Sequence, residues 1–458
     1  MEREKLGSRL GFILLSAGCA IGVGNVWKFP YMVGQNGGAI FVLIYLGFLL
    51  VMGLPVLTME FALGRASQKS MTRLYQELEP KGSKWHIHGY AALVGNVILM
   101  MFYTVVSGWL LQYFVKMVKG DFTGVTSQVA TSQFGLMLQD PWMQILFTGI
   151  VVVLGFTVCA FGVKNSLERV TKIMMIALLV IMVVLAINGF FMDGTKEGLK
   201  FYLVPNVENV KEVGIFNVIT GAMSQSFFTL SLGIGSMAIF GSYLGKDRSL
   251  FGEAVNVAVL DTFVAFVAGL IIFPACFTYN NGNVSAGPPL IFETLPNIFN
   301  NMPLGRLWGS LFFLFLSFAA LSTVFAVFEN ILAFVQEITK MSRKKLCIIL
   351  AVVMFVLTIP CVLGFNAWSG FTPFGDGSSV LDLEDFIVSN LLLPIGSFTF
   401  VMFCILKKGK GWGYENFENE VNTGKGLKLQ KWMKGYVRFV LPVIMFAFIV
   451  ISIVTFFI

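Results

Sequence analysis

The chain of 458 residues is 56% hydrophobic and 12% charged, whereas a soluble domain is typically about 25% charged. This composition excludes an ordinary soluble globular protein and favours a multi-pass membrane protein. The formal net charge of +7 does not require a nucleic acid partner, because the anionic lipids of the inner leaflet attract basic segments. We therefore expect membrane lipids, and no nucleic acid, as partners.

Eleven segments are long and apolar enough to cross a hydrocarbon core of about 30 Å, which predicts an all-α polytopic membrane protein. They lie near residues 10–34, 39–64, 88–117, 142–161, 167–190, 216–243, 252–277, 306–337, 346–364, 384–406 and 436–457. The first segment is too long for the apolar core of a signal peptide, so we expect it to remain as a membrane span.

The basic residues predict the orientation of these spans. If residues 1–9 form a cytoplasmic tail, cytoplasmic segments hold 25 of the 32 Lys and Arg residues and external segments hold six, with Lys28 inside the first span. This asymmetry follows the positive-inside rule. We expect a protein of the cell inner (plasma) membrane with a cytoplasmic N-terminus and an external C-terminus.

The first and sixth segments contain glycine-rich stretches that are unfavourable for a helix. Gly18, Gly22 and Gly24 lie within seven residues, and each costs about 1 kcal/mol relative to Ala in a helix interior. The stretch Phe227–Ser236 has the same character. Broken helices at corresponding positions of two halves point to a transporter's binding site, because irregular backbone at membrane depth must line a cavity or be buried. The alternative is that the glycines only allow close helix packing.

The two breaks divide a single transporter domain, residues 1–458, into two repeats of five spans. We expect a five-plus-five inverted repeat with residues 10–190 as the first half and 216–406 as the second. Residues 407–435 are then a cytoplasmic linker, and 436–457 an appended eleventh helix. The apolar, proline-containing loop Thr278–Pro303 is expected to pack as a lid over the external face.

A helix break exposes backbone groups that can bind ligands. The half-helix that ends exposes carbonyls, which suit sodium, and the half-helix that begins exposes N–H groups, which suit a carboxylate. An amino acid carries a carboxylate and an ammonium group, so two antiparallel broken helices suit it well.

Polar side chains inside the spans are functional candidates. Asp261 lies deep in the seventh span and should find a cation, a proton or a hydrogen-bond donor. Ser322 and Thr323 in the eighth span could complete a sodium site of oxygen ligands, or bond back to their own helix. Tyr103 has a single hydroxyl on an apolar helix and could serve only in packing.

Other charged groups suggest bracing or gating. Glu60 in the second span and the pair Glu329–Asn330 in the eighth are expected to brace helices within the membrane rather than to bind substrate. The acidic cluster Asp382–Asp385 lies at the external mouth of the tenth span, and Lys28 lies just beyond the first break. These charges could form an outer latch or a solvated acidic rim.

The residues that enzymes and metal sites require are not arranged in a recognisable pattern. None of the six cysteines shows CxxC spacing, and no nucleophile–base pair or metal-ligand cluster is evident. His86 and His88 are the only histidines and are expected at the membrane interface rather than on a metal. We expect no enzyme activity.

Four strings in the chain resemble the neurotransmitter:sodium symporter family. They are GCAIGVGNVWKFPYMVGQNGGAIF, LPVLTMEFALGR, SFFTLSLGIG and FAALSTVF. The resemblance runs to about Ile405 and is strongest to the bacterial amino-acid branch, several members of which have eleven spans. It implies sodium-dependent import of an amino acid by alternating access.

The resemblance also implies the residues of two sodium sites, a substrate site and two gates. The first sodium site is implied to use Ala20, Asn25, Thr229 and Asp261, and the second Gly18, Ile21, Ala319, Ser322 and Thr323. The implied ligands of the substrate's carboxylate and ammonium groups are Val23, Gly24, Tyr103, Ala20, Phe228, Thr229 and Ser231, with Phe228 also as the lid. The implied side-chain pocket consists of Leu99, Ile234 and Val327. The implied gates are Lys28 with Asp385 outside and Arg3 with Glu337 inside.

Four positions depart from the family pattern. Lys28 replaces the more usual Arg, Leu6 stands where a Trp commonly plugs the inner gate, and Ile176 stands where a Pro is expected. Asp261 replaces the Asn of animal relatives, whose neighbouring site binds chloride. A fixed carboxylate should make chloride unnecessary, and it could allow proton antiport if its proton exchanges with sodium.

The sequence therefore predicts a sodium-coupled importer of neutral L-amino acids, with two sodium ions. Large aliphatic or aromatic substrates are favoured because the implied pocket offers no charged partner. A proton-coupled transporter of the same architecture and an ion channel stay open as alternatives. The oligomeric state is not indicated.

Overall fold

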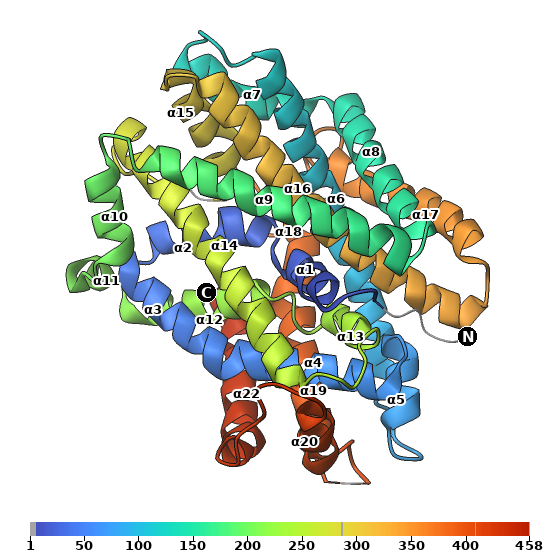
Figure 1. Ribbon diagram of the computed structural model, residues 1–458. Coiled ribbons are helices and arrows are strands. Elements are labelled where there is room, and N and C mark those ends of the chain that lie inside the picture. Colours follow the sequence, from blue (N-terminus) through green and yellow to red (C-terminus); the bar gives the residue numbers. More distant parts are fainter. Residues whose placement is uncertain (1–5, 285–286, 408, 458) are drawn as a thin grey trace.

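The computed structural model describes residues 6–284, 287–407 and 409–457, with side chains described up to residue 454. This part of the chain is helical, with two isolated β-bridges and no strand. The expected all-α fold is therefore confirmed. Figure 1 shows the helices gathered in one bundle, with α22 and α20 projecting together at one end.

The first half of the chain contains α-helices and short π-helical segments, labelled η. They are α1 (Arg9–Ala20), η1 (Gly24–Lys28), α2 (Phe29–Gln35), α3 (Ala39–Phe48), η2 (Leu49–Gly53), α4 (Leu54–Ser67), α5 (Met71–Leu78), α6 (His86–Lys119), α7 (Ser127–Gln139), α8 (Pro141–Ala160), η3 (Val163–Leu167) and α9 (Glu168–Gly189). Two short helices then lead to the second half, α10 (Thr195–Leu203) and α11 (Val207–Val213).

The second half begins with another interrupted helix. Its elements are α12 (Ile215–Phe228), α13 (Ser236–Gly241), α14 (Leu250–Tyr279), η4 (Leu290–Thr294), α15 (Leu295–Asn301), α16 (Gly305–Thr339), α17 (Arg343–Leu363), α18 (Val380–Asp385), η5 (Phe386–Leu392) and α19 (Leu393–Ile405). The remaining elements are α20 (Tyr414–Asn422), α21 (Met433–Gly435), η6 (Tyr436–Val440) and α22 (Leu441–Phe457).

All eleven apolar segments lie on helices. Among the described residues, nine continuous helical segments are long and apolar enough to cross a membrane, and the bent pair Arg9–Ala20 and Gly24–Gln35 is a tenth. The remaining segment, near residues 216–243, is divided into α12 and α13, and neither is long enough alone. The first and sixth helices are therefore broken, as expected.

Backbone conformation defines both breaks. Ile21 ends α1 with ψ at 93°, and the helix that follows departs from the axis of α1 by 58°. In the second break Ser231, Gly233 and Gly235 all have positive φ, at 51°, 101° and 73°. Gly233 also lies against α19, because a Cβ there would come 2.1 Å from the Leu393 carbonyl oxygen. A residue with a side chain cannot occupy that position without moving the backbone.

The first break lies in the middle of the bundle. Figure 1 shows α1 near the centre, with α9, α14, α16 and α13 around it, and contacts join α1 to each of these helices. The long helices α6 and α16 pack along each other beside it. Irregular backbone in α1 is therefore surrounded by protein, as the membrane requires.

The loop between α14 and α16 forms a compact cover, as expected. Within η4, Leu290 and Phe292 are fully buried. The Phe292 ring stacks on Phe134 of α7 at 4.8 Å between centroids, and its carbonyl accepts a hydrogen bond from the Tyr113 hydroxyl at 2.9 Å. Aromatic packing thus attaches this loop to α6 and α7.

The linker before the last helix is attached to the bundle through a buried arginine. Arg65, at the end of α4, is 1% exposed and donates from Nε to a Glu420 carboxylate oxygen at 2.6 Å. Its Nη1 donates to the Arg248 carbonyl, also at 2.6 Å. A further backbone hydrogen bond runs from Lys425 to Asp247 at 2.9 Å. Residues near α20 are therefore an ordered part of the fold.

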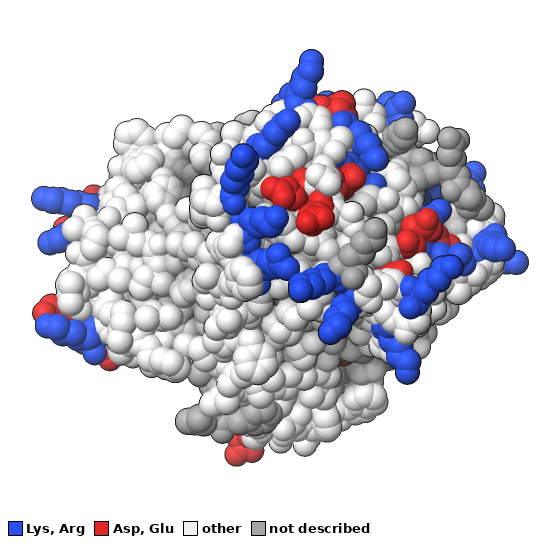
Figure 2. All heavy atoms as spheres, turned by 90° about the horizontal axis from the view of Figure 1, so that it is seen from below, with Lys and Arg blue, Asp and Glu red and all other residues white. Residues whose placement is uncertain are grey.

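Charged side chains are concentrated on part of the surface. Figure 2, seen from below, shows Lys and Arg side chains around acidic groups in one region, beside a broad surface with few charges. An uncharged surface of this kind suits contact with lipid. The charge distribution is consistent with a multi-pass membrane protein.

Candidate functional site

Three polar residues from different elements meet between the two breaks. Asn25 lies in η1, Thr229 follows α12, and Asp261 lies in α14; each is at most 1% exposed. The Asn25 amide donates to one Asp261 carboxylate oxygen at 2.7 Å and to the Thr229 hydroxyl oxygen at 3.0 Å. The Thr229 hydroxyl donates to the other Asp261 oxygen at 2.8 Å. We call these three residues the first cation cluster.

The chemistry of this cluster suits a small hard cation. Its side chains offer carboxylate and hydroxyl oxygens, ligand types that such ions prefer, while the Asn25 amide oxygen accepts a hydrogen bond from the Gly22 N–H at 3.2 Å. Among the described residues, no Lys, Arg or His forms an ion pair with Asp261. A buried carboxylate without a basic partner is costly unless a cation or proton accompanies it. The residues therefore fit a sodium ion.

A second cluster joins the end of α1 to the middle of α16. The Ser322 hydroxyl is 2.9 Å from the Gly18 carbonyl oxygen and 2.9 Å from the Ala319 carbonyl oxygen. The Thr323 hydroxyl lies 3.3 Å from the Gly18 carbonyl and 3.4 Å from that of Ala319. The two hydroxyls thus reach both their own helix and α1. Ile21, expected in this set, is fully buried at the end of α1.

Tyr103 and Phe228 approach the backbone that follows the first break. The Val23 N–H donates to the Tyr103 hydroxyl at 3.1 Å. The Phe228 ring lies so close to Gly24 that a Cβ on this glycine would come within 2.5 Å of it. A side chain at position 24 would therefore displace the Phe228 ring from the backbone that it covers. The structure brings Tyr103, Val23, Gly24 and Phe228 together.

The remaining expected substrate residues are buried or partly buried. The Ser231 hydroxyl is 3.3 Å from the Cys19 carbonyl, next to Ala20. Ile234 and Val327 are buried, and Leu99 is partly buried one helical turn before Tyr103 on α6. These three side chains are apolar and carry no charge.

Several further residues hold the breaks in place, and sequence reasoning missed the contacts of two of them, Gln225 and Asn96. The Gln225 amide lies 3.4 Å from the Gly24 carbonyl and thereby joins the two broken helices. The Asn96 amide donates to the Ile234 carbonyl at 2.8 Å. Glu60, expected to brace helices, accepts a hydrogen bond from the Gly233 N–H at 2.6 Å. A polar residue within an apolar span was the available signal for Asn96, but its partner is not readable from the sequence.

The expected outer gate has a different geometry from a direct ion pair. The Lys28 ammonium lies 3.7 Å from the centroid of the Phe228 ring, and among the described residues no ion pair joins it to Asp385. Asp385 accepts a hydrogen bond from Ser389 at 2.7 Å, while Asp382 caps α18. Lys28 therefore contacts the expected lid residue itself, through a cation–π interaction.

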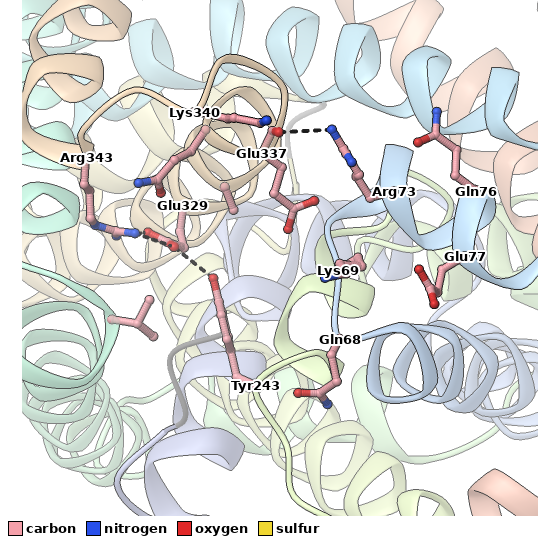
Figure 3. Close-up of a pocket in the computed structure, with 13 residues that line it drawn as sticks. Gln68, Lys69, Arg73, Gln76, Glu77, Tyr243, Glu329, Glu337, Lys340 and Arg343 are labelled. Atoms are coloured by element: carbon pink, nitrogen blue, oxygen red, sulfur yellow. Dashed lines mark hydrogen bonds and ion pairs between the residues drawn. The ribbon is translucent and has the colours of Figure 1, made fainter. Parts of the chain in front are cut away.

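A cavity of about 600 Å³ lies at the end of the bundle that carries α5 and the α16–α17 connection. Figure 3 shows Glu337 and Arg73 beside this cavity, with Tyr243 and Arg343 both directed at Glu329. Glu337 accepts hydrogen bonds from the Ser70 N–H at 3.0 Å and its hydroxyl at 2.6 Å, at the start of α5. Arg3, its expected gate partner, lies outside the described residues.

The structure shows the surroundings of Leu6 and Ile176, two of the residues that depart from the family pattern. Leu6 is partly buried against the core, so a smaller apolar side chain stands where a Trp was expected. Ile176 is 46% exposed, and α9 runs through it without interruption. The absence of proline there leaves a continuous helix.

Two broken helices, facing each other around buried oxygen clusters inside a helical bundle, define a secondary transporter. The chain belongs to the Sodium:neurotransmitter symporter family, whose sequence profile matches residues 3–132 and 141–457. It is thus a sodium-dependent transporter and not an enzyme.

Individual relatives agree with this assignment. The chain is 33% identical over 435 residues to an uncharacterized sodium-dependent transporter, YhdH, of Bacillus subtilis, covering 95% of this chain and 94% of that protein. It is 27% identical to sodium- and chloride-dependent GABA transporter 2 of Rattus norvegicus, over 78% of this chain and 67% of that one. The crystal structure of MhsT in complex with L-phenylalanine superposes with a TM-score of 0.87 at 35% identity, covering 98% and 99% of the two chains.

Proposed function

We propose that this protein imports neutral L-amino acids with large aliphatic or aromatic side chains together with sodium. The observation that carries the proposal is the first cation cluster, in which Asp261 bonds residues of both broken helices. A cation held there lies beside the exposed backbone of the first break. The substrate carboxylate can then share the cation, so each should strengthen the binding of the other.

We assign two sodium ions to the site and propose that chloride is not required. The first ion is assigned to Asn25, Thr229 and Asp261 with the Ala20 carbonyl, and the second to Ser322 and Thr323 with carbonyls of α1 and α16. Asp261 supplies the fixed negative charge that chloride would otherwise supply. The second ion joins α1 to α16 and should favour the outward-facing conformation, so its loss should free the inner gate.

The pocket and the structural relative support the proposed substrate class. Leu99, Ile234 and Val327 are apolar, and burying a charged side chain against them is unfavourable. The related MhsT structure holds L-phenylalanine. We therefore assign the carboxylate to Val23, Gly24 and Tyr103, and the ammonium to carbonyls near Ala20, Phe228 and Thr229 with Ser231 nearby.

The remaining assignments concern gates and topology. Lys28 with Phe228 and Asp385 is assigned to the outer gate and Glu337 to the inner one, with Arg3 as its proposed partner. The distribution of basic residues supports a cytoplasmic N-terminus and an external C-terminus. We also propose that the domain is a five-plus-five inverted repeat, followed by a linker and an eleventh helix.

The test is uptake by the purified protein in proteoliposomes. A panel of labelled amino acids is offered while sodium, chloride and proton gradients are imposed separately. We expect accumulation of L-phenylalanine and L-leucine that requires inward sodium and is unaffected by replacing chloride. Uptake that follows only the proton gradient would support a proton-coupled transporter instead, and unsaturable current without amino acid would support a channel.

A further inference from the structure

Asn96 is a buried residue of α6 whose side chain makes four hydrogen bonds. It is 1% exposed. Its amide nitrogen donates to the Ala92 carbonyl at 2.7 Å and to the Ile234 carbonyl at 2.8 Å. Its amide oxygen accepts from the Ser236 hydroxyl at 3.2 Å and from the Asn330 amide at 3.0 Å. Both donors and both acceptor positions of the amide are therefore used, which fixes its orientation.

Two of these partners mark the end of the second break. Ile234 is in the non-helical segment, and Ser236 is the first residue of α13. Holding the Ile234 carbonyl determines where the Ile234 side chain stands, and this side chain is assigned to the substrate pocket. Asn96 therefore acts on the pocket through the backbone of Ile234.

The third partner connects the pocket to the helix that carries the second cation cluster. Asn330 follows Thr323 by seven residues on α16, which is about two helical turns and the same face. Asn330 is 1% exposed, and among the described residues its amide oxygen has no hydrogen-bond partner. Its observed role is thus the hydrogen bond to Asn96.

The same part of α16 also holds the other end of α13. Glu329, next to Asn330, accepts a hydrogen bond at 2.9 Å from the hydroxyl of Tyr243, just beyond the end of α13. Figure 3 shows this contact beside the cavity, together with the ion pair between Arg343 and Glu329. Adjacent residues of α16 therefore restrain α13 at both ends, at Ser236 through Asn96 and at Tyr243 directly.

We propose that Asn96 is a positioning residue that fixes the part of the substrate pocket formed by Ile234. We propose further that Asn330 connects this part of the pocket to α16, the helix of the second cation cluster. The proposal rests on the proposed function. A fully hydrogen-bonded buried amide specifies one arrangement of its neighbours, because any displacement leaves polar groups unpaired. Loss of Asn96 should therefore alter which substrate fits.

The test compares Asn96→Leu with Thr104→Val in proteoliposome uptake. Thr104 is a matched control, since it is a buried residue of α6 whose hydroxyl, among the residues that the structure describes, bonds only its own helix, at Met100. We expect Asn96→Leu to raise the KM for L-phenylalanine at saturating sodium at least tenfold, with the maximal rate within threefold of wild type. The preference for L-phenylalanine over L-valine should fall at least fivefold. Thr104→Val should leave both quantities within twofold.

If Asn96→Leu is not monodisperse and so cannot be measured, a second variant, Asn330→Leu, still tests the proposal. Asn330→Leu leaves the Asn96–Ile234 hydrogen bond possible and should raise the same KM three- to tenfold. Combined with Asn96→Leu it should add less than twofold, because Asn330 acts through Asn96. Unchanged KM and selectivity in whichever folded variant is measured would overturn the proposal. Absence of sodium-dependent uptake by the wild type contradicts the proposed function instead.

Discussion

Asp261 contributes the carboxylate around which both breaks are organised, since it bonds Asn25 after the first break and Thr229 within the second. We expect Asp261→Ala to reduce sodium-dependent uptake at least 100-fold, because the first cation loses its charged ligand. Uptake in proteoliposomes under an inward sodium gradient measures this effect. Thr104→Val serves as the control for a buried polar substitution. Uptake by Asp261→Ala close to that of wild type would remove this residue from the coupling site.

Ser322 is predicted to act on sodium rather than on substrate, because its hydroxyl lies between the carbonyls of Gly18 and Ala319. Ser322→Ala should raise the sodium concentration for half-maximal uptake at least fivefold. The substrate KM at saturating sodium should stay within twofold. Ser317→Ala is the matched control on α16, since its buried hydroxyl bonds only Phe313 of the same helix within the described part of the chain. Equal sodium dependence in the two variants would contradict the assignment.

At the scale of residues, the sequence predicted which polar groups cluster, but not which residues hold those groups in position. Asn25, Thr229 and Asp261 were expected together from the family strings, and they are in contact. The bonds from Gln225 to Gly24 and from Asn96 to Ile234 were not expected. A polar residue in an apolar helix indicates that a partner exists, whereas the partner's identity depends on how distant helices are rotated against each other.

At the scale of elements, the non-helical segment between α12 and α13 depends on glycine. Gly233 has φ at 101°, and a Cβ there would contact the Leu393 carbonyl oxygen. We expect Gly233→Ala to lower stability by about 2 kcal/mol or more, through strain and displacement of α19. The thermal midpoint of the purified protein in detergent measures this loss.

Gly135→Ala provides the control for that substitution. Gly135 lies in α7 with open space around the position of a Cβ, and Ala is the better helix former. Its midpoint should be equal to or above that of wild type. If both variants melt like the wild type, the backbone at Gly233 is not constrained as described.

Most of the helices could be predicted because length and hydropathy alone determine which segments enter a membrane. The breaks were also predictable, since clustered glycines weaken a helix. The π-helical segments such as η1 and η5 were not, because they arise where packing forces an extra residue into a turn. The attached helix α20 was not predicted for a similar reason. Its attachment depends on the buried Arg65, which in the sequence is only one basic residue among many.

At the scale of the whole molecule, the attachment of the linker should contribute to stability. Arg65→Met leaves Glu420, whose side chain is 12% exposed, without its buried partner. Breaking a buried pair in this way typically costs about 3–5 kcal/mol, so the thermal midpoint should fall by several degrees. Lys211→Met is the control, because its pair with Glu208 is exposed and contributes little. Equal midpoints for these two variants would show that the linker is not held by Arg65.

Transport of sodium with a neutral substrate moves net charge across the whole protein. Each net charge gains about 2.3 kcal/mol per 100 mV, which corresponds to about a fiftyfold change in accumulation. An inside-negative potential imposed by a potassium gradient and valinomycin should therefore increase the accumulated L-phenylalanine steeply. Accumulation that ignores the potential would indicate electroneutral exchange, as expected if a proton leaves for each sodium that enters.

The seven residues 229–235 separate α12 from α13. Because they are not helical, this part of the sixth span can change its length. As a helix they would span about 10 Å, whereas extended they could reach about 23 Å. The ends of the two helices can therefore separate or approach without breaking a helical hydrogen bond. Glu60 and Asn96 hold this segment at one length through the Gly233 N–H and the Ile234 carbonyl. Any movement of α13 that changes the length of this segment must therefore break or stretch these two hydrogen bonds.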